Sequence, residues 1–404
     1  MIAPKIRFPG FTGEYIANSL SEISDRVRRK NSENQTDIPL TIASIEGLVD
    51  QRTYFGKTVA SKDMSGYYLL QNGEFAYNKS YSKGFPVGSI KRLDKYARGA
   101  LSTLYICFAL KDDADVTSDY LVQYFNSPAW YEVVNEVCAE GARNHGLLNV
   151  SPNDFFETVH YFAPSKEEQD KVSTFLELYD TKIENQLAKV EALETRRKGL
   201  LQQVFTQNIR FRTDDGNEFP DWEQYTLGDI LTEYKEKCEN NGTYEHVSLT
   251  KEGVVPKTER YNREHLVTHD DKAYRVTHVD DICYNPANLK FGVICRNKYR
   301  DAIFSPIYVT FHVNEGFMPG FVERLVVRGD FIADALQYQE GSIYERMAVS
   351  PENLLSMTVE APTVAEQQKI AEFFDLIDEQ IQIEKDKLEA IKQVKKGLLQ
   401  QMFV

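Results

Sequence analysis

The sequence predicts an α+β fold made by tandem duplication, in which two mixed α/β domains are each followed by a long helix and the two helices pair as an antiparallel coiled coil. The first observation is an octapeptide that occurs twice, as KGLLQQVF at 198–205 and as KGLLQQMF at 396–403. The second is the extent of this repeat, because residues 164–205 and 362–403 are identical at 18 of 42 positions without a gap. The third is the helical spacing of apolar residues in both copies.

Shorter landmarks extend the duplication through the rest of the chain. They are FPGFTGEYIANSLSEI at 8–23 with FPDWEQYTLGDI at 219–230, GEFAYNK at 73–79 with DDICYNP at 280–286, LYICF at 104–108 with IYVTF at 307–311, EG at 140 with EG at 340, and VSP at 150 with VSP at 349. The segments between the landmarks differ. The duplication therefore covers the whole chain, and its variable parts lie between shared positions.

The landmarks and the change of periodicity predict four segments in order. These are a first domain at 1–164, a first long helix at 165–205, a linker and second domain at 206–362, and a second long helix at 363–404. Within the domains, short apolar runs between Gly, Asn and Asp turns predict strands; the runs are LYICFAL, GEFAYN, DAIFSPIYVTFHV and FVERLVV. SDYLVQYFNSPAWYEVVNEV at 118–137 predicts a helix among them.

The two long helices have clear start signals and an apolar seam that needs a partner. Pro164 and Pro362 precede them, each followed by a Ser or Thr cap and a Glu in the first turn. A helix of about 40 residues is roughly 60 Å long, which exceeds what one small domain can cover. The other copy is the expected partner, and pairing of equivalent helices implies an antiparallel arrangement. The alternative is two unrelated helices, each packed on its own domain.

Composition indicates a soluble globular protein of the cytoplasm. The 404 residues include 42% apolar and 27% charged residues, with no apolar run long enough for a membrane span and no apolar stretch at the N-terminus. The five cysteines form no C-x-x-C pair. The net charge is -14, of which residues 206–362 carry -9, but basic clusters persist within this acidic background and remain available for nucleic acid.

Motifs for catalysis are absent from the sequence, and we expect no enzyme activity and no metal site in this chain. YNPAN at 284–288 departs at Ala287 and Asn288 from the N-P-P-Y signature of adenine methyltransferases, and no glycine-rich loop for a methyl donor precedes it. YFGKT at 54–58 lacks the first glycine of a phosphate-binding loop.

Two diverged domains held apart by a pair of long helices are typical of a protein that recognises two DNA sequences at a fixed distance from each other. Arg and Lys side chains can pair with guanine edges and Asn with adenine edges, while other Lys and Arg side chains hold phosphates. The predicted DNA-binding residues are Asn78, Lys79, Tyr81, Lys83, Arg92, Arg98, Arg143 and Asn144 in the first half, and Asn285, Asn288, Lys290, Arg296, Lys298 and Arg346 in the second. For any one basic cluster, solvated surface charge is an equal alternative.

Taken together, these features resemble the DNA specificity subunit of type I restriction-modification systems. The resemblance rests on the FPGFTGE opening, the FPDWEQYTLGDI restart, the paired YN, EG and VSP landmarks and, above all, the duplicated helices. It implies two target recognition domains that read the two parts of a split, asymmetric DNA sequence.

The resemblance also implies partners that carry the chemistry. Two modification subunits would dock on the repeats and methylate adenine from S-adenosylmethionine, and restriction subunits would add translocation and cleavage driven by ATP and Mg. No cofactor is expected in this chain. The docking residues implied are Lys198, Gly199, Gln202, Gln203, Lys396, Gly397, Gln400 and Gln401. Packing of the helix ends alone is an equal alternative for these residues, and a coiled-coil scaffold without DNA readout is the alternative function.

Overall fold

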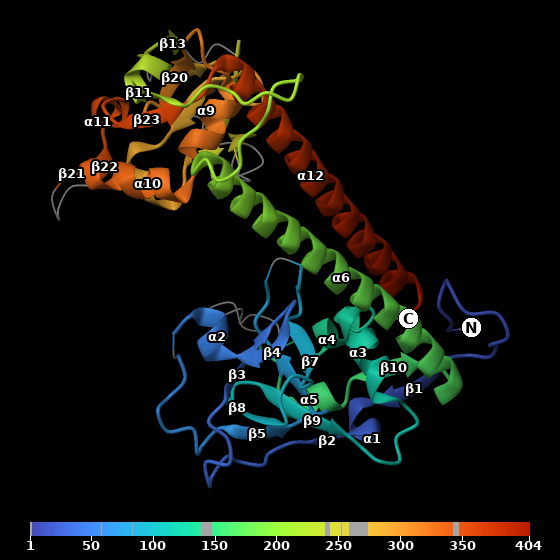
Figure 1. Ribbon diagram of the computed structural model, residues 1–404. Coiled ribbons are helices and arrows are strands. Elements are labelled where there is room, and N and C mark those ends of the chain that lie inside the picture. Colours follow the sequence, from blue (N-terminus) through green and yellow to red (C-terminus); the bar gives the residue numbers. More distant parts are fainter. Residues whose placement is uncertain are drawn as a thin grey trace. The chain divides into compact units, whose positions relative to one another are not determined.

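The chain forms two compact units that do not follow the boundaries of the duplication. The computed structural model describes residues 2–57, 59–82, 84–138, 148–238, 243–251, 253–257, 274–341 and 347–404. The first unit is Met1–Leu187 with Asp386–Val404, and the second unit is Ala188–Lys385. The long helices α6 (Lys166–Phe205) and α12 (Val364–Gln401) therefore each contribute to both units (Figure 1).

The first unit contains two four-stranded sheets, a two-stranded ribbon and short helices. One sheet has the order β2 (Ser24–Arg26), β9 (Ile106–Leu110), β6 (Phe75–Asn78), β7 (Ser89–Arg92), and the other has the order β4 (Gly47–Asp50), β3 (Pro39–Ala43), β8 (Arg98–Leu101), β5 (Tyr68–Gln71). The ribbon pairs β1 (Ile16–Ser19) with β10 (Val159–Phe162). The helices are α1 (Leu20–Ile23), α2 (Gln51–Phe55), α3 (Ser118–Asn126), α4 (Tyr131–Glu136) and α5 (Pro152–Phe156).

The second unit repeats this plan with a longer second sheet. Its first sheet has the order β12 (Leu231–Tyr234), β20 (Val309–Val313), β17 (Ile282–Tyr284), β18 (Ile294–Arg296), and its second has the order β13 (Lys237–Cys238), β16 (Tyr274–Thr277), β19 (Ala302–Phe304), β14 (Glu245–Thr250), β15 (Gly253–Pro256). Two ribbons pair β11 (Glu223–Thr226) with β23 (Thr358–Ala361) and β21 (Gln339–Glu340) with β22 (Ala348–Val349). The helices are α7 (Leu227–Ile230), η2 (Pro286–Phe291), α9 (Pro319–Val326), α10 (Gly329–Ala335), η3 (Leu336–Tyr338) and α11 (Pro351–Leu355).

The sheet topology of the two units corresponds, apart from β13 and the β21–β22 ribbon of the second unit. In each unit an antiparallel hairpin, β3 with β4 or β14 with β15, lies beside one parallel pairing, β3 with β8 or β14 with β19. The strand that contains the tyrosine of the YN landmark also has the same neighbours, since β6 lies between β9 and β7 just as β17 lies between β20 and β18. The duplication seen in the sequence is thus a duplication of topology.

Two expectations about local structure need correction. FVERLVV at 321–327 was expected to be a strand, but it lies in helix α9, where Pro319 occupies the first turn and Phe321, Val322, Leu325 and Val326 are buried. These positions share one helical face, which a short apolar run does not distinguish from a strand. The helix expected at 118–137 is divided into α3 and α4 around the Ser-Pro pair that follows Asn126, because proline restricts the residue before it.

Each long helix ends in the core of the unit that contains the start of the other helix. In the first unit Leu399, Met402 and Phe403 of the C-terminal end are buried, and the Phe403 ring lies 5.2 Å from that of Tyr120. In the second unit Leu201 and Val204 are buried among the residues of its domain. These leucines, Val204 and Phe403 belong to the duplicated octapeptide. The apolar residues of the octapeptide therefore pack in the domain cores.

The same hydrogen bonds attach the start of each helix to its domain. The side chain of Gln169 accepts a hydrogen bond from the amide of Thr117 at 2.7 Å and donates to the carbonyl of Ala163 at 2.8 Å. Gln367 accepts from Met318 at 2.9 Å and donates to the carbonyl of Pro362 at 2.9 Å. Both Gln side chains are buried, so these polar groups fix the angle at which each helix leaves its sheet.

An arginine in front of each domain clamps the first turn of a long helix. Arg7 donates from Nε and Nη2 to the two carboxylate oxygens of Glu168 at 2.6 and 2.8 Å, and Arg210 donates in the same way to Glu366 at 2.9 and 2.9 Å. Both glutamates are buried. The carboxylate hydrogen bonds raise the pKa of both guanidinium groups above its usual value. Bidentate pairs of this kind fix orientation as well as charge.

Candidate nucleic-acid interface and partner surfaces

The predicted readout residues of the YN landmarks lie at the ends of equivalent strands. Asn78 ends β6, and its side-chain oxygen accepts a hydrogen bond from the amide of Ser80 at 3.0 Å. Asn285 follows β17, and its side-chain oxygen accepts from the amide of Ala287 at 3.1 Å. Both asparagines thus shape the turn that leaves the strand. This use of the side-chain oxygen is typical of Asn in turns.

In the first unit the strand-end turn is joined to the VSP landmark. Lys79 donates from Nζ to the carbonyl of Val150 at 3.4 Å, and its own carbonyl accepts from the amide of Leu148 at 3.0 Å. Tyr81, further along this segment, is exposed. Arg98 is the first residue of β8, an inner strand of the other sheet, and is also exposed. The structure therefore brings Asn78 and Lys79 together and places Arg98 on a different strand.

Arg92 and Arg296 occupy equivalent strand positions and serve the fold in the same way. Arg92 donates to Asp94 and to Asp119, each at 2.7 Å, which ties β7 to the first turn of α3. The guanidinium of Arg296 lies 3.3 Å from the carboxylate of Glu323 in α9. Each arginine joins a strand edge to the helix packed on it. Their charges are compensated within the chain, and a role at DNA remains a prediction for both.

The other second-half residues surround the short helix η2 and the strand after it. Asn288 and Lys290 are exposed on η2, and the Lys290 ammonium lies 5.1 Å from the centre of the exposed Phe291 ring. The Lys298 ammonium group lies 2.9 Å from the carboxylate of Glu323 and forms an ion pair with it. Asn288 and Lys290 are thus grouped with Asn285. Lys83, Arg143, Asn144 and Arg346 lie outside the described residues.

Within the duplicated octapeptides the polar residues are exposed. Lys198, Gly199, Gln202 and Gln203 lie on the outer side of α6, and Lys396 and Gln400 on that of α12. Gln401 donates to the carbonyl of Gly397 at 3.0 Å, and its own carbonyl accepts from the amide of Ile6 at 2.9 Å. In the second unit the carbonyl of Gln203 accepts from Ile209 at 3.1 Å in the equivalent bond. The polar positions are available for docking, whereas the apolar positions are occupied by packing.

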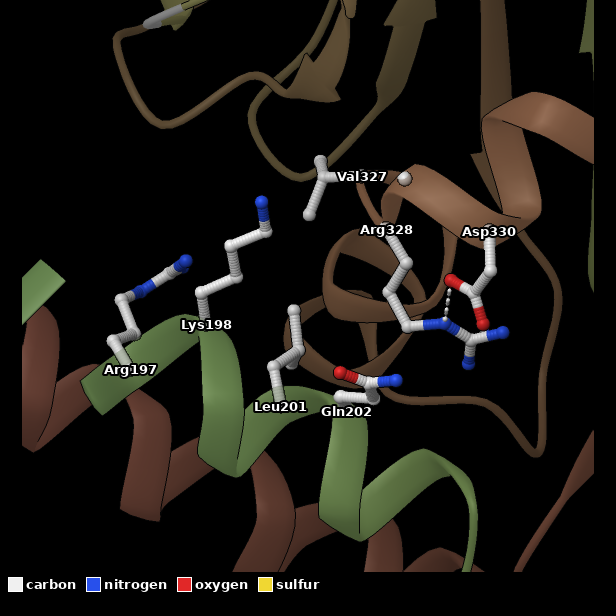
Figure 2. Close-up of a pocket in the computed structure, with 8 residues that line it drawn as sticks. Arg197, Lys198, Leu201, Gln202, Val327, Arg328 and Asp330 are labelled. Carbon is white, nitrogen blue, oxygen red and sulfur yellow. Dashed lines mark hydrogen bonds and ion pairs between the residues drawn. The ribbon is translucent and has the colours of Figure 1, made fainter. Parts of the chain in front are cut away.

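A surface pocket in the second unit adjoins the first octapeptide. It has a volume of about 380 Å³ and lies between the end of α6, with Lys198, Leu201 and Gln202, and the segment that joins α9 to α10 (Figure 2). Arg328 lines the far side, where it donates to Asp330 at 3.0 Å and lies 4.3 Å from the centre of the Phe205 ring. The Lys198 side chain extends along the rim. A carboxylate could be bound here by Lys198 and Gln202.

A carboxylate in each long helix links it to the other helix inside each unit. In the second unit Asp378 of α12 accepts from Arg197 of α6 and, at 2.9 Å, from the buried Arg324 of α9. In the first unit Asp180 of α6 accepts from Lys395 of α12 and, at 3.1 Å, from the buried Gln123 of α3. The helices run antiparallel at both places, because residues later in α6 pair with residues earlier in α12.

The charge environment of the two carboxylates differs. Lys91, which donates to Asn126 at 2.6 Å, has a pKa lowered to about 8 by burial and by the nearby charge of Lys395, while Asp180 opposes the shift. In the second unit the buried guanidinium of Arg324 also donates to Asp375 at 2.6 Å. The carboxylate and the cation of the other long helix are therefore repeated, whereas the buried donor to the carboxylate is Gln123 in one unit and Arg324 in the other.

The structure also shows a repeated apolar surface that the sequence analysis did not identify. On the first unit Phe8 packs against Phe175 with ring centres 5.4 Å apart, and Leu178 beside them is 56% exposed. A shallow hollow of about 420 Å³ lies over these three side chains. On the second unit Phe211 packs against Phe373 at 5.5 Å, and Leu376 is 67% exposed. We call these the twin apolar patches.

The signal for the twin patches was present in the repeat. Phe175 and Leu178 correspond to Phe373 and Leu376 at the constant offset of 198. Both leucines lie outside the buried face of their helices, where an apolar residue has no packing role. The repeat thus retains an exposed apolar residue at the same position in both copies.

Other site chemistry is limited among the described residues. Within that part of the chain, no group of three or more His, Cys, Asp or Glu side chains is placed to hold a metal ion. None of the helices described is both long and apolar enough to span a membrane. The long helices are exposed on one side and carry many charges.

Comparison with known proteins places the fold. No family model and no curated protein matches the chain. Two solved structures match over nearly full length: a chain from a study of complex assembly and conformational transition of the type I R-M system (13% identity, 98% of each chain, TM-score 0.57), and the S subunit of a type I restriction-modification system from M. genitalium (12% identity, 100% of this chain and 99% of that chain, TM-score 0.55). The chain thus has the fold of type I restriction-modification specificity subunits, which confirms the resemblance at the level of fold.

Proposed function

We propose that the chain is the DNA specificity subunit of a type I restriction-modification complex. The observation that carries this proposal is the contrast between two kinds of surface. The contacts that hold the long helices recur in both units at equivalent positions, whereas the segments after the strand-end asparagines differ: Lys79 donates to the carbonyl of Val150 in the first unit, and the short helix η2 follows in the second. Repeated surfaces bind two copies of one partner, and diverged turns bind two unlike half-sequences of one DNA site.

The readout side of the proposal rests on the strand ends. Asn78 and Lys79 in the first unit, and Asn288 and Lys290 in the second, lie at the edges where β6 and β17 end. The excess negative charge of residues 206–362 opposes phosphate contact. We therefore assign a large share of phosphate binding to the partner subunits.

The recruitment side rests on the twin apolar patches together with the exposed polar residues of the octapeptides. Two modification subunits dock there and supply adenine methylation from S-adenosylmethionine, and restriction subunits add ATP- and Mg-dependent translocation and cleavage. The chain itself is non-catalytic in this proposal. It acts in the cytoplasm, where DNA and its partners are present.

The spacing between the half-sequences tests the proposal. Four residues inserted into α6 after Leu187 and four into α12 after Lys385 lengthen both helices by about 6 Å, which is close to two base pairs. Methylated adenines are then mapped in a host that carries the complete system. The expected result is a nonspecific gap longer by about two base pairs, with both half-sequences unchanged.

Two results contradict the proposal. Altered half-sequences with an unchanged gap show that the length of the long helices does not set the spacing between the half-sequences. A complex that assembles but methylates no split sequence favours the scaffold without DNA readout. A gel-shift assay in which the chain binds neither cognate nor random duplexes, with or without modification subunits, favours it as well.

A further inference from the structure

An exposed aliphatic side chain occupies the same turn in both units. Leu104 is 69% exposed and Ile307 is 59% exposed, although each precedes a tyrosine and a buried strand. The two residues correspond in the LYICF and IYVTF landmarks. Each lies at the third position of a tight turn, because the amide of Tyr105 donates to the carbonyl of Ser102 at 3.2 Å and that of Tyr308 to Ser305 at 3.1 Å. Polar residues or glycine are usual at such tips.

The strand register places each aliphatic residue beside the turn that leaves the YN strand. Tyr77 pairs with Ile106 in β9, and Tyr284 pairs with Val309 in β20. Continuing the antiparallel register by two residues sets Leu104 opposite Lys79. The same step in the second unit sets Ile307 opposite Pro286, the first residue of η2.

In the first unit this juxtaposition forms a small hollow. Its volume is about 70 Å³, and it is lined by Asn78, Lys79, Ser80, Leu104 and Tyr105. Three polar residues, a tyrosine and one aliphatic residue therefore line the same space. A hollow of this size has room for a methyl group.

The chemistry of an aliphatic group restricts what it can recognise on DNA. Leu and Ile can neither donate nor accept a hydrogen bond, and the one apolar group that base edges display in the major groove is the C5-methyl group of thymine. We propose that Leu104 and Ile307 are specificity-determining residues, each packing on a thymine methyl group in one half-sequence. This inference rests on the proposed function. Docking of a partner protein fits less well, because the neighbours of Leu104 include the lysine and asparagine already predicted to contact DNA.

The test removes the methyl group from the DNA and the side chain from the protein. The complete complex methylates duplexes in which each thymine of the recognition sequence is replaced, one at a time, by deoxyuridine. We expect one position in each half-sequence at which this replacement slows methylation by the wild-type complex on the order of tenfold. Leu104→Ala abolishes the effect in one half-sequence only, and Ile307→Ala abolishes it in the other.

A matched control and three results decide the outcome. Val159→Ala, also an exposed apolar residue but on the β1–β10 ribbon, leaves the deoxyuridine effects unchanged. Wild-type rates for both turn variants overturn the inference, and so do lower rates that keep both deoxyuridine effects. Loss of complex assembly by Leu104→Ala in size-exclusion chromatography overturns it in favour of protein docking. A wild-type complex with no split-sequence preference contradicts the proposed function instead.

Discussion

Arg197 of α6 donates hydrogen bonds to Asp378 of α12, and the corresponding positions of the repeat are bonded in reverse, with Lys395 of α12 donating to Asp180 of α6. Asp180 corresponds to Asp378 and Arg197 to Lys395 at the offset of the repeat. The same interaction between the two long helices thus occurs once in each unit. Within each unit, a carboxylate of one long helix is thus bound by a cation of the other.

Neutralising either carboxylate should loosen its own unit. Asp378→Asn leaves Arg197 and the buried Arg324 with less compensation, and Asp180→Asn leaves Lys395 beside Lys91. We expect a loss of about 1–3 kcal/mol in the free energy of opening, because unpaired buried charge is costly. Hydrogen exchange of peptides from α9 should rise in the first variant and of peptides from α3 in the second.

The neighbouring Glu379→Gln is the control for the Asp378 variant. Glu379 is exposed on the same helix, so its exchange pattern should match that of the wild type. Equal exchange in α9 for Asp378→Asn and Glu379→Gln would show that the bond contributes nothing to the second unit.

Replacing Arg210 by lysine should destabilise the second unit although the charge is retained. Lysine cannot form the two parallel bonds that Arg210 makes to the buried Glu366, and we expect a loss of about 1–2 kcal/mol in the free energy of unfolding. Arg212→Lys is the control, because the Arg212 side chain is 64% exposed and pairs with an exposed Glu218. Urea unfolding should place Arg212→Lys within about 0.5 kcal/mol of the wild type. A larger loss of unfolding free energy for Arg212→Lys than for Arg210→Lys contradicts a stabilising role for the bidentate pair of Arg210 and Glu366.

The first unit should lose stability as the pH falls below neutrality, because of His160. This buried imidazole lies between the Tyr124 hydroxyl at 2.9 Å and the Thr158 hydroxyl at 2.8 Å, and burial lowers its pKa to about 3. The unfolded chain binds a proton near pH 6.5, whereas the folded unit does not until about pH 3. Between these values protonation favours the unfolded state, which amounts to about 2 kcal/mol between pH 7 and pH 5.

The variant His160→Gln isolates this effect from that of the carboxylates. Its free energy of unfolding is lower at pH 7, but the part of the pH dependence that comes from His160 should vanish. The measurement is the difference between wild type and variant in hydrogen exchange of β10 at pH 7 and pH 5, corrected for intrinsic exchange. If the difference in β10 exchange between wild type and variant is the same at pH 7 and pH 5, protonation of His160 does not contribute to the pH dependence. The equivalent residue in the second unit is Val359, so exchange of β23 should show no such change.

A charge placed in one twin apolar patch should remove one modification subunit. Leu178→Glu and Leu376→Glu leave the exposed side of the helix folded, since glutamate is a good helix former, but set an unpaired carboxylate against an apolar partner surface. Light scattering of the assembled complex should show one bound subunit for each single variant and none for the double variant. Full occupancy in the double variant contradicts the assignment of the patches, and Glu379→Gln serves again as the control.

Local signals accounted for much of what could be predicted. The boundaries of the long helices followed from Pro164 and Pro362, their caps and the spacing of apolar residues, and α6 and α12 begin within two residues of those expected. Strands at LYICF and its equivalent were also expected, and β9 and β20 begin at the third residue of each pentapeptide. The FVERLVV segment was predicted wrongly, because its apolar residues fit both periods over so short a length.

Contacts between distant residues decided the rest. Arg92 and Arg296 were chosen as DNA contacts on residue type, but the fold sets each beside carboxylates of the helix that covers its strand. Nothing in the local sequence marks Asp119 or Glu323 as those partners. The twin patches were missed for the related reason that exposure of Leu178 depends on which face of α6 is covered.

The sequence by itself determined that the chain is a duplication with two long amphipathic helices, because repetition and helical period are properties of residue order alone. Only the tertiary structure decided that each helix ends in the core of the unit where the other helix begins, and that Asp378 meets Arg197 across 181 residues. The physical reason is that a buried surface or an ion pair is satisfied by whichever groups the fold brings into contact, and residue order does not specify which groups those are.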